Sequence, residues 1–157
     1  MFLLADIVWP ALVLVGHLMA WPIIAVGLLI EAAFVYYIYR ASMRDTLVMT
    51  IGINLMSTAF GIVLIPLLGA IWELITGRAV YFLFHFGTFN LINWFATFIL
   101  ATISNTIIET WGLKKIFKRP VTKRIFGLIF FANSISVALA IISIYFSAPP
   151  NGGPGIF

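Results

Sequence analysis

Residues 46–71 read TLVMTIGINLMSTAFGIVLIPLLGAI, an uninterrupted stretch without a charged side chain. At a rise of about 1.5 Å per residue, a helix of this length crosses the hydrocarbon core of a bilayer, which is about 30 Å thick. Comparable stretches lie on both sides of it, and 63% of the 157 residues are hydrophobic while 9% are charged. A soluble chain of this size cannot bury that much apolar surface. The sequence therefore predicts an all-α integral membrane protein and excludes a soluble enzyme.

Apolar stretches of spanning length predict four membrane crossings, at about residues 22–39, 46–71, 91–113 and 125–146. Pro22 fits the start of the first crossing, because proline is well tolerated in the first turn of a helix. Pro66 predicts a kink in the second crossing. We expect residues 1–157 to form a single membrane domain.

Two further apolar segments, residues 2–19 and 81–89, are too short to span a bilayer comfortably. Pro10 interrupts the first of them and Gly87 interrupts the second. We expect both to be interfacial or re-entrant segments at the outer face of the membrane.

Positive charge is concentrated in two loops. Arg40 and Arg44 follow the first crossing, and six more basic residues follow the third: Lys114, Lys115, Lys118, Arg119, Lys123 and Arg124. Because cytoplasmic loops carry an excess of Lys and Arg, both loops are predicted to be cytoplasmic and both termini external, in the inner membrane of a prokaryote. The long basic loop also invites contact with anionic lipid or an acidic partner. Its position between two apolar segments argues against nucleic-acid binding.

The order of polar residues is repeated. Glu31 is followed by a basic turn and by Asn54-Leu-Met-Ser57, and Glu109 is followed by a basic turn and by Asn133-Ser-Ile-Ser136. The spacing is 78 residues for the two Glu and 79 for the two Asn. This pattern predicts two parallel repeats, residues 1–77 and 78–157, related by an axis along the membrane normal. Chance is the alternative, because Ile, Leu and Phe match readily between any two membrane helices.

The same order of Glu, basic turn and Asn-x-x-Ser resembles that of small four-helix membrane proteins of prokaryotes. The resemblance covers residues 29–57 and 107–136, and it implies a four-helix membrane fold without an assigned activity. The two halves of this chain depart from each other where Gly112 replaces Phe34.

Six polar residues lie near the predicted middle of the membrane: Glu31, Asn54, Ser57, Glu109, Asn133 and Ser136. A carboxylate at this depth costs at least about 3 kcal/mol, so it should face the helix bundle and find a partner. The Asn and Ser side chains would serve as hydrogen-bonding contacts between helices. The two Glu residues have a second interpretation, as a site for a proton or a cation.

No cofactor is predicted. His17 and His85 are candidate ligands for a haem or a metal ion, but neither lies in a predicted crossing and no further ligand group accompanies them. The sequence contains no Gly-rich phosphate loop and no nucleophile, base and acid in a recognisable pattern. We therefore expect a protein without enzymatic activity.

Two functions remain after these exclusions. The large apolar surface and the lack of soluble domains favour a non-enzymatic subunit that packs against other membrane proteins, or against further copies of itself, within the lipid bilayer. The alternative is a small transporter or channel for a proton, a cation or a small polar solute, which would use the mid-membrane Glu, Asn and Ser residues.

Overall fold

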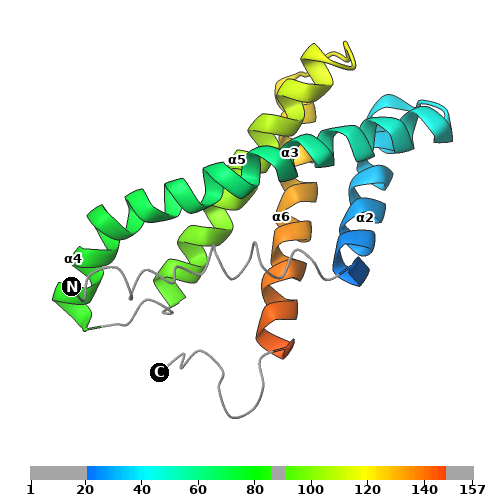
Figure 1. The fold of residues 1–157 in the computed structure, drawn as a ribbon. Coiled ribbons are helices and arrows are strands. Elements are labelled where there is room, and N and C mark those ends of the chain that lie inside the picture. Colours follow the sequence, from blue (N-terminus) through cyan, green and yellow to red (C-terminus); the bar gives the residue numbers. More distant parts are fainter. Residues whose placement is uncertain (1–20, 86–90, 148–157) are drawn as a thin grey trace.

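A computed structural model of the chain describes residues 21–85 and 91–147 (Figure 1). Its helices are α2 (Trp21–Tyr39), α3 (Met43–Trp72), the π-helical turn η1 (Glu73–Gly77), α4 (Arg78–Phe84), α5 (Leu91–Lys115) and α6 (Lys123–Ser147). Over the described residues, four helical segments are long and apolar enough to cross a membrane: Pro22–Tyr39, Met43–Phe84, Leu91–Lys115 and Lys123–Ser143. The predicted all-α architecture is thereby confirmed for these residues, and four of the helical segments have the length and composition of membrane crossings. The predicted segment 2–19 and both termini lie outside the described residues.

Local sequence signals set the turns after α2 and α5. Arg40 and Lys118 adopt left-handed backbone conformations, with φ of 48° and 51°, which redirect the chain after each helix. The Ser42 hydroxyl then accepts the Asp45 N–H at 3.1 Å, and the Thr122 hydroxyl accepts the Ile125 N–H at 3.3 Å. Such caps satisfy backbone donors that have no partner inside the helix.

The second crossing differs from the sequence prediction. Helical backbone continues from α3 through η1 and α4, so that Met43–Phe84 forms one rod of 42 residues. At about 1.5 Å per residue this rod is about 63 Å long, roughly twice the thickness of the hydrocarbon core. The first residues of the predicted short segment, 81–84, therefore belong to the end of this rod, while residues 86–90 lie outside the described chain.

The reason for this continuation lies in the residues around η1. No proline follows Pro66 before the end of α4, and Pro66 itself lies inside α3 without ending it. Gly77 lies beneath the Glu73 side chain, where a Cβ atom would approach Glu73 Oε2 to 2.5 Å. The π-helical turn thus accommodates the Glu73 carboxylate against Gly77.

The four long helices form a ring in the cyclic order α2, α3, α5, α6, in which each packs against its two neighbours. In Figure 1, α3 crosses obliquely over the bundle, and α4 continues it away from α2. In this ring α2 lies opposite α5, and α3 lies opposite α6.

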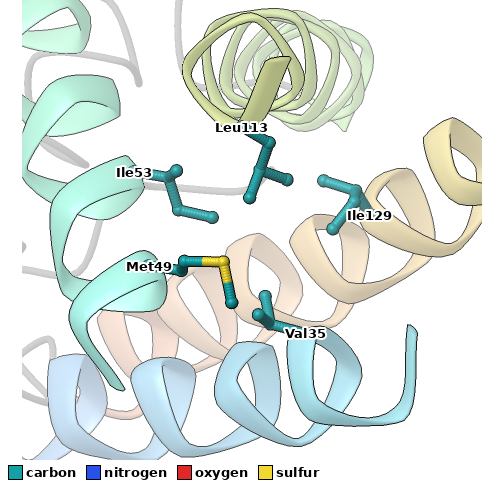
Figure 2. Close-up of a cluster of buried hydrophobic side chains, with 5 residues drawn as sticks. All are labelled: Val35, Met49, Ile53, Leu113 and Ile129. Carbon is teal, nitrogen blue, oxygen red and sulfur yellow. The ribbon is translucent and has the colours of Figure 1, made fainter. Parts of the chain in front are cut away.

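Two apolar clusters lie inside the ring. One, which we call the plug, consists of Val35, Met49, Ile53, Leu113 and Ile129, all at most 2% exposed (Figure 2). Every helix of the ring contributes to it, and it lies at the end that carries the turns 40–42 and 116–122, here called the basic end. The second cluster, towards the opposite end, consists of Ile65, Ala101, Val137 and Ala140.

Candidate functional site

Glu31 and Asn54 form a pair between α2 and α3. The Asn54 amide Nδ2 donates to Glu31 Oε2, and also to the Thr50 carbonyl at 3.0 Å. Glu31 is 6% exposed. The bond to the Thr50 carbonyl fixes the amide on its own helix, so Asn54 presents an N–H group to the carboxyl of Glu31.

Glu109 and Asn133 form a pair of the same design between α5 and α6. The Asn133 amide Nδ2 donates to Glu109 Oε2 at 2.7 Å and to the Ile129 carbonyl, four residues earlier, at 3.2 Å. Both side chains are 1% exposed. The two pairs therefore share their donor atom, their acceptor atom and their anchor on the preceding helical turn.

The two serines connect the pairs across the ring. Ser136 lies beside the Glu31 carboxyl, and Ser57 lies beside the Glu109 carboxyl. The Ser57 hydroxyl donates to the Asn54 carbonyl at 3.1 Å, whereas the Ser136 hydroxyl forms no hydrogen bond. The two carboxyl groups are also close enough to repel each other. The structure thus gathers all six residues singled out in the sequence into one cluster.

This cluster retains unused hydrogen-bonding capacity. Among the described residues, three buried polar atoms in or next to the cluster lack a partner: Glu109 Oε1, Thr50 Oγ1 and Ser136 Oγ. An unsatisfied buried polar atom costs about 1–3 kcal/mol, and such atoms in natural proteins call for a specific explanation. The cluster is thus able to receive a further hydrogen-bonding or charged species.

A cavity of about 160 Å³ begins at this cluster and extends away from the basic end. Glu31, Asn54, Ser57 and Ser136 line its floor. Its walls come from every helix of the ring and are mainly apolar: Ile23, Ile24, Gly27, Leu28, Thr58, Gly61, Ile62, Ile65, Ala101, Asn105, Val137 and Ala140.

The mouth of this cavity lies between α2 and α3. Its exposed lining residues belong to these helices, with Ile24 40% and Ile62 55% exposed, whereas Ala101 on α5 and Val137 on α6 are buried. Residues 78 positions apart differ in size and burial. Thr102 and Thr106 of α5 are fully buried, at 0% exposure, whereas Ile24 and Leu28 of α2 line the cavity.

At the basic end the plug separates the carboxyl cluster from the two loops. Leu113 is 0% exposed, and Val35 and Ile53 are each 1% exposed. A close-packed apolar layer of this kind has no room or partners for water or ions. The cluster is therefore reached from one side of the ring and sealed on the other.

Aromatic residues and Arg119 hold the two turns together at that end. The Tyr39 hydroxyl donates to the Pro120 carbonyl at 3.0 Å, and the Arg119 guanidinium lies over the Tyr39 ring, 5.8 Å from its centroid. Phe117 packs on Gly52 so closely that a Cβ there would lie 2.6 Å from the ring. Lys114 and Lys115 end α5 and Lys123 begins α6, so the predicted basic loop surrounds this joint.

A second buried polar contact, which the sequence did not predict, lies at the end of the ring opposite the basic end. Trp72 Nε1 donates to Asn93 Oδ1 at 3.0 Å, and the Thr97 hydroxyl donates to the Asn93 carbonyl at 2.8 Å. Asn93 is 1% exposed and Thr97 is 0% exposed. The spacing of Asn93, Thr97 and Ser104 along one face of α5 was the signal that could have revealed it.

One of the two candidate metal ligands, His85, lies in the described part of the chain. His85 is exposed, follows α4 in a left-handed conformation, and has its ring 6.3 Å from that of Tyr81. Residues 21–85 and 91–147 contain no group of three or more His, Cys, Asp or Glu side chains able to hold a metal ion. His17 lies outside these ranges.

Comparison with known proteins found no protein-family model, no curated relative and no solved structure that matches the chain.

Proposed function

We propose that this protein is a small membrane transporter that takes up a proton or a cation at the cluster of Glu31, Glu109 and their Asn and Ser neighbours. The observation that carries the proposal is the pairing of a buried carboxyl cluster with a cavity that reaches it from one side only. A purely structural set of hydrogen bonds between helices requires neither an accessible cavity nor unpartnered polar atoms.

The charge balance of the cluster supports this function. Two carboxylates that face each other in a low-dielectric interior repel, and each would cost at least about 3 kcal/mol as an unpaired ion. Asn54 and Asn133 supply hydrogen bonds but no positive charge. A proton or a monovalent cation between the two carboxyls relieves their repulsion and leaves one buried negative charge in place of two, which makes uptake of positive charge the favourable reaction of this site.

The matched geometry of the two pairs also supports our proposal that the halves are parallel repeats. In such an arrangement both basic turns face the cytoplasm, and the cavity opens towards the outer half of the membrane. The plug then closes the cytoplasmic path. Alternating access would require the plug residues to separate while the gap between α2 and α3 closes.

Reconstitution into liposomes tests the proposal. Purified protein in liposomes with an internal pH indicator or a Na⁺ or K⁺ indicator should move the ion down an imposed gradient faster than empty liposomes do. Glu31→Gln should reduce this flux to the level of empty liposomes while leaving the folded protein intact, because glutamine keeps the hydrogen-bonding shape without the titratable charge.

Glu73→Gln provides the matched control. Glu73 is a carboxylate of the same chain that lies in η1, outside the cavity lining, and its replacement should leave the flux unchanged. Transport equal to that of empty liposomes under every gradient tested, or full transport by Glu31→Gln, would contradict the proposal.

A second candidate function, packing against another membrane protein, is favoured by a different part of the molecule. The rod beyond η1 exposes large apolar side chains, with Phe82 79% and Leu83 66% exposed. Stoichiometric co-purification of a second membrane protein, lost in Phe82→Ser, would support this function.

A further inference from the structure

The cavity above Glu31 has a chemical character more specific than that of a general ion site. Glu31 is the one charged side chain among the described residues that line it. The charge of a bound molecule must therefore be positive if it is charged at all. Most of the remaining lining is hydrocarbon, which has no polar atoms to replace the water ligands of a metal ion.

The hydrogen-bonding groups at the floor are mainly acceptors towards the cavity. Asn54 uses its Nδ2 group on Glu31 and on the Thr50 carbonyl, and Ser57 donates its hydroxyl to the Asn54 carbonyl. The Glu31 carboxylate remains as an acceptor, and the Ser136 hydroxyl beside it can accept a further hydrogen bond while its own O–H points to the carboxylate. An ammonium group carries three donors and no acceptor, so it complements this floor.

The size of the cavity limits the rest of the molecule. A volume of about 160 Å³ is close to that of an engineered apolar cavity of about 150 Å³ that holds benzene, a molecule of six non-hydrogen atoms. Ile23, Ile65 and Val137 would surround the body of a ligand of that size. The exposed Ile24 and Ile62 at the mouth make the route between α2 and α3 apolar as well.

We propose that the cavity binds a small amphipathic amine, namely a primary alkylammonium ion of about six to seven non-hydrogen atoms in total. Its ammonium group lies at Glu31 and Ser136, and its hydrocarbon body lies between α2, α3 and α6. This inference rests on the proposed cation site and names its ligand class. The ligand reaches the site between α2 and α3, with its apolar body moving along the isoleucines of the mouth.

A series of straight-chain alkylammonium ions tests the inference. Their binding is measured by titration calorimetry on the full chain in lipid nanodiscs, with empty nanodiscs subtracted to remove partition into lipid. Affinity should rise about fourfold for each added methylene, the fold-change that corresponds to about 0.8 kcal/mol per buried CH₂. The rise should end near pentyl- or hexylammonium, when the cavity is full, and the alcohols of equal length should bind at least tenfold more weakly.

Two variants make the result specific to this cavity. Glu31→Gln should weaken binding of pentylammonium at least tenfold, while Glu73→Gln should leave it unchanged. Gly27→Ala adds one methyl group to the cavity wall at an ordinary contact distance, 3.5 Å from the Ser136 oxygen, and should move the optimum to a shorter chain.

Several results would overturn the inference. These are the absence of alkylammonium binding, equal binding by alcohols, or an optimum that does not move in Gly27→Ala. If alkylammonium ions fail to bind but Glu31-dependent proton or Na⁺ flux is present, the ligand class is wrong and the proposed transport function stands. If both the binding and the flux are absent, both proposals fail.

Discussion

The two Glu–Asn pairs have the same bonds and different surroundings. Glu31 is 6% exposed and borders a cavity, whereas Glu109 is 1% exposed and is enclosed by protein. The residues that bond to the carboxyls cannot explain the difference, because each pair has an Asn donor anchored on a carbonyl of the preceding turn. The neighbouring positions differ, since Ile24 and Leu28 line the cavity beside Glu31, whereas Thr102 and Thr106, 78 residues further along, are fully buried.

This comparison separates what each half provides. The second pair is a dry, closed contact that holds its two helices together. The first pair has the same chemistry at the bottom of a cavity, where a ligand can reach it. The asymmetry of the cavity, and not the presence of a buried glutamate, is therefore the feature that points to function.

The largest expected effect is on the side of the membrane from which each basic turn can be labelled. If they are parallel repeats, their basic turns lie on the same side of the membrane, and single cysteines at the exposed Met43 and Ile116 should both label from the cytoplasm only. A cysteine at His85 should label only from outside. The sequence contains no native cysteine to interfere. Labelling of positions 43 and 116 from opposite sides would break the comparison, because the halves would then be inverted.

The plug is expected to depend equally on both halves. Met49→Ala in the first half and Leu113→Ala in the second each remove a side chain that is at most 2% exposed. Each should lower the free energy of unfolding by about 2–5 kcal/mol, as for other large-to-small substitutions in close-packed interiors. Unfolding in mixed detergent measures the loss, with the 77% exposed Leu91→Ala as control. A loss confined to one half would show that the plug is not a shared layer.

The two asparagines should differ in their contribution to stability. Asn133→Leu leaves the enclosed Glu109 without its donor and should cost about 1–3 kcal/mol, the usual penalty for a stranded buried polar group. Asn54→Leu should cost less, because Glu31 can still be hydrated through the cavity. The same unfolding assay compares them. Equal losses would indicate that Glu31 is as dry as Glu109.

The smallest expected change in unfolding free energy comes from replacing the two serines. Ser57→Ala removes a hydrogen bond to the Asn54 carbonyl and should cost about 0.5–1.5 kcal/mol. Ser136→Ala removes a hydroxyl that has no partner, so the unfolding free energy should stay the same or increase slightly. A larger loss for Ser136→Ala would show that this hydroxyl is already engaged and is not free for a ligand.

Several features of the molecule were predictable from the sequence, because they depend on length and depth alone. Apolar length gave the crossings, and the distance of Glu31 and Asn54 from the first basic turn placed them at the same depth, where the structure joins them. Other features depend on how helices are inclined. The cavity between α2 and α3 arises from the packing of distant segments, which spacing along one helix does not reveal. The spacing of polar residues on α5 marks the face that carries Asn93, but it does not identify Trp72 as the partner. The rod through Phe84 was missed because Glu73 and Gly77 have the composition of a helix exit.

Carbodiimide labelling tests the difference between the two carboxyls most directly. Dicyclohexylcarbodiimide is an apolar reagent that reacts with protonated carboxyl groups accessible from the membrane and leaves a stable adduct, which peptide mass spectrometry can assign to a residue. We predict an adduct on Glu31 at least tenfold more abundant than that on Glu109, and protection of Glu31 by a bound cation. Equal modification of both residues, preferential modification of Glu109, or no modification of Glu31 would contradict the claim that the cavity makes the first pair an accessible binding site.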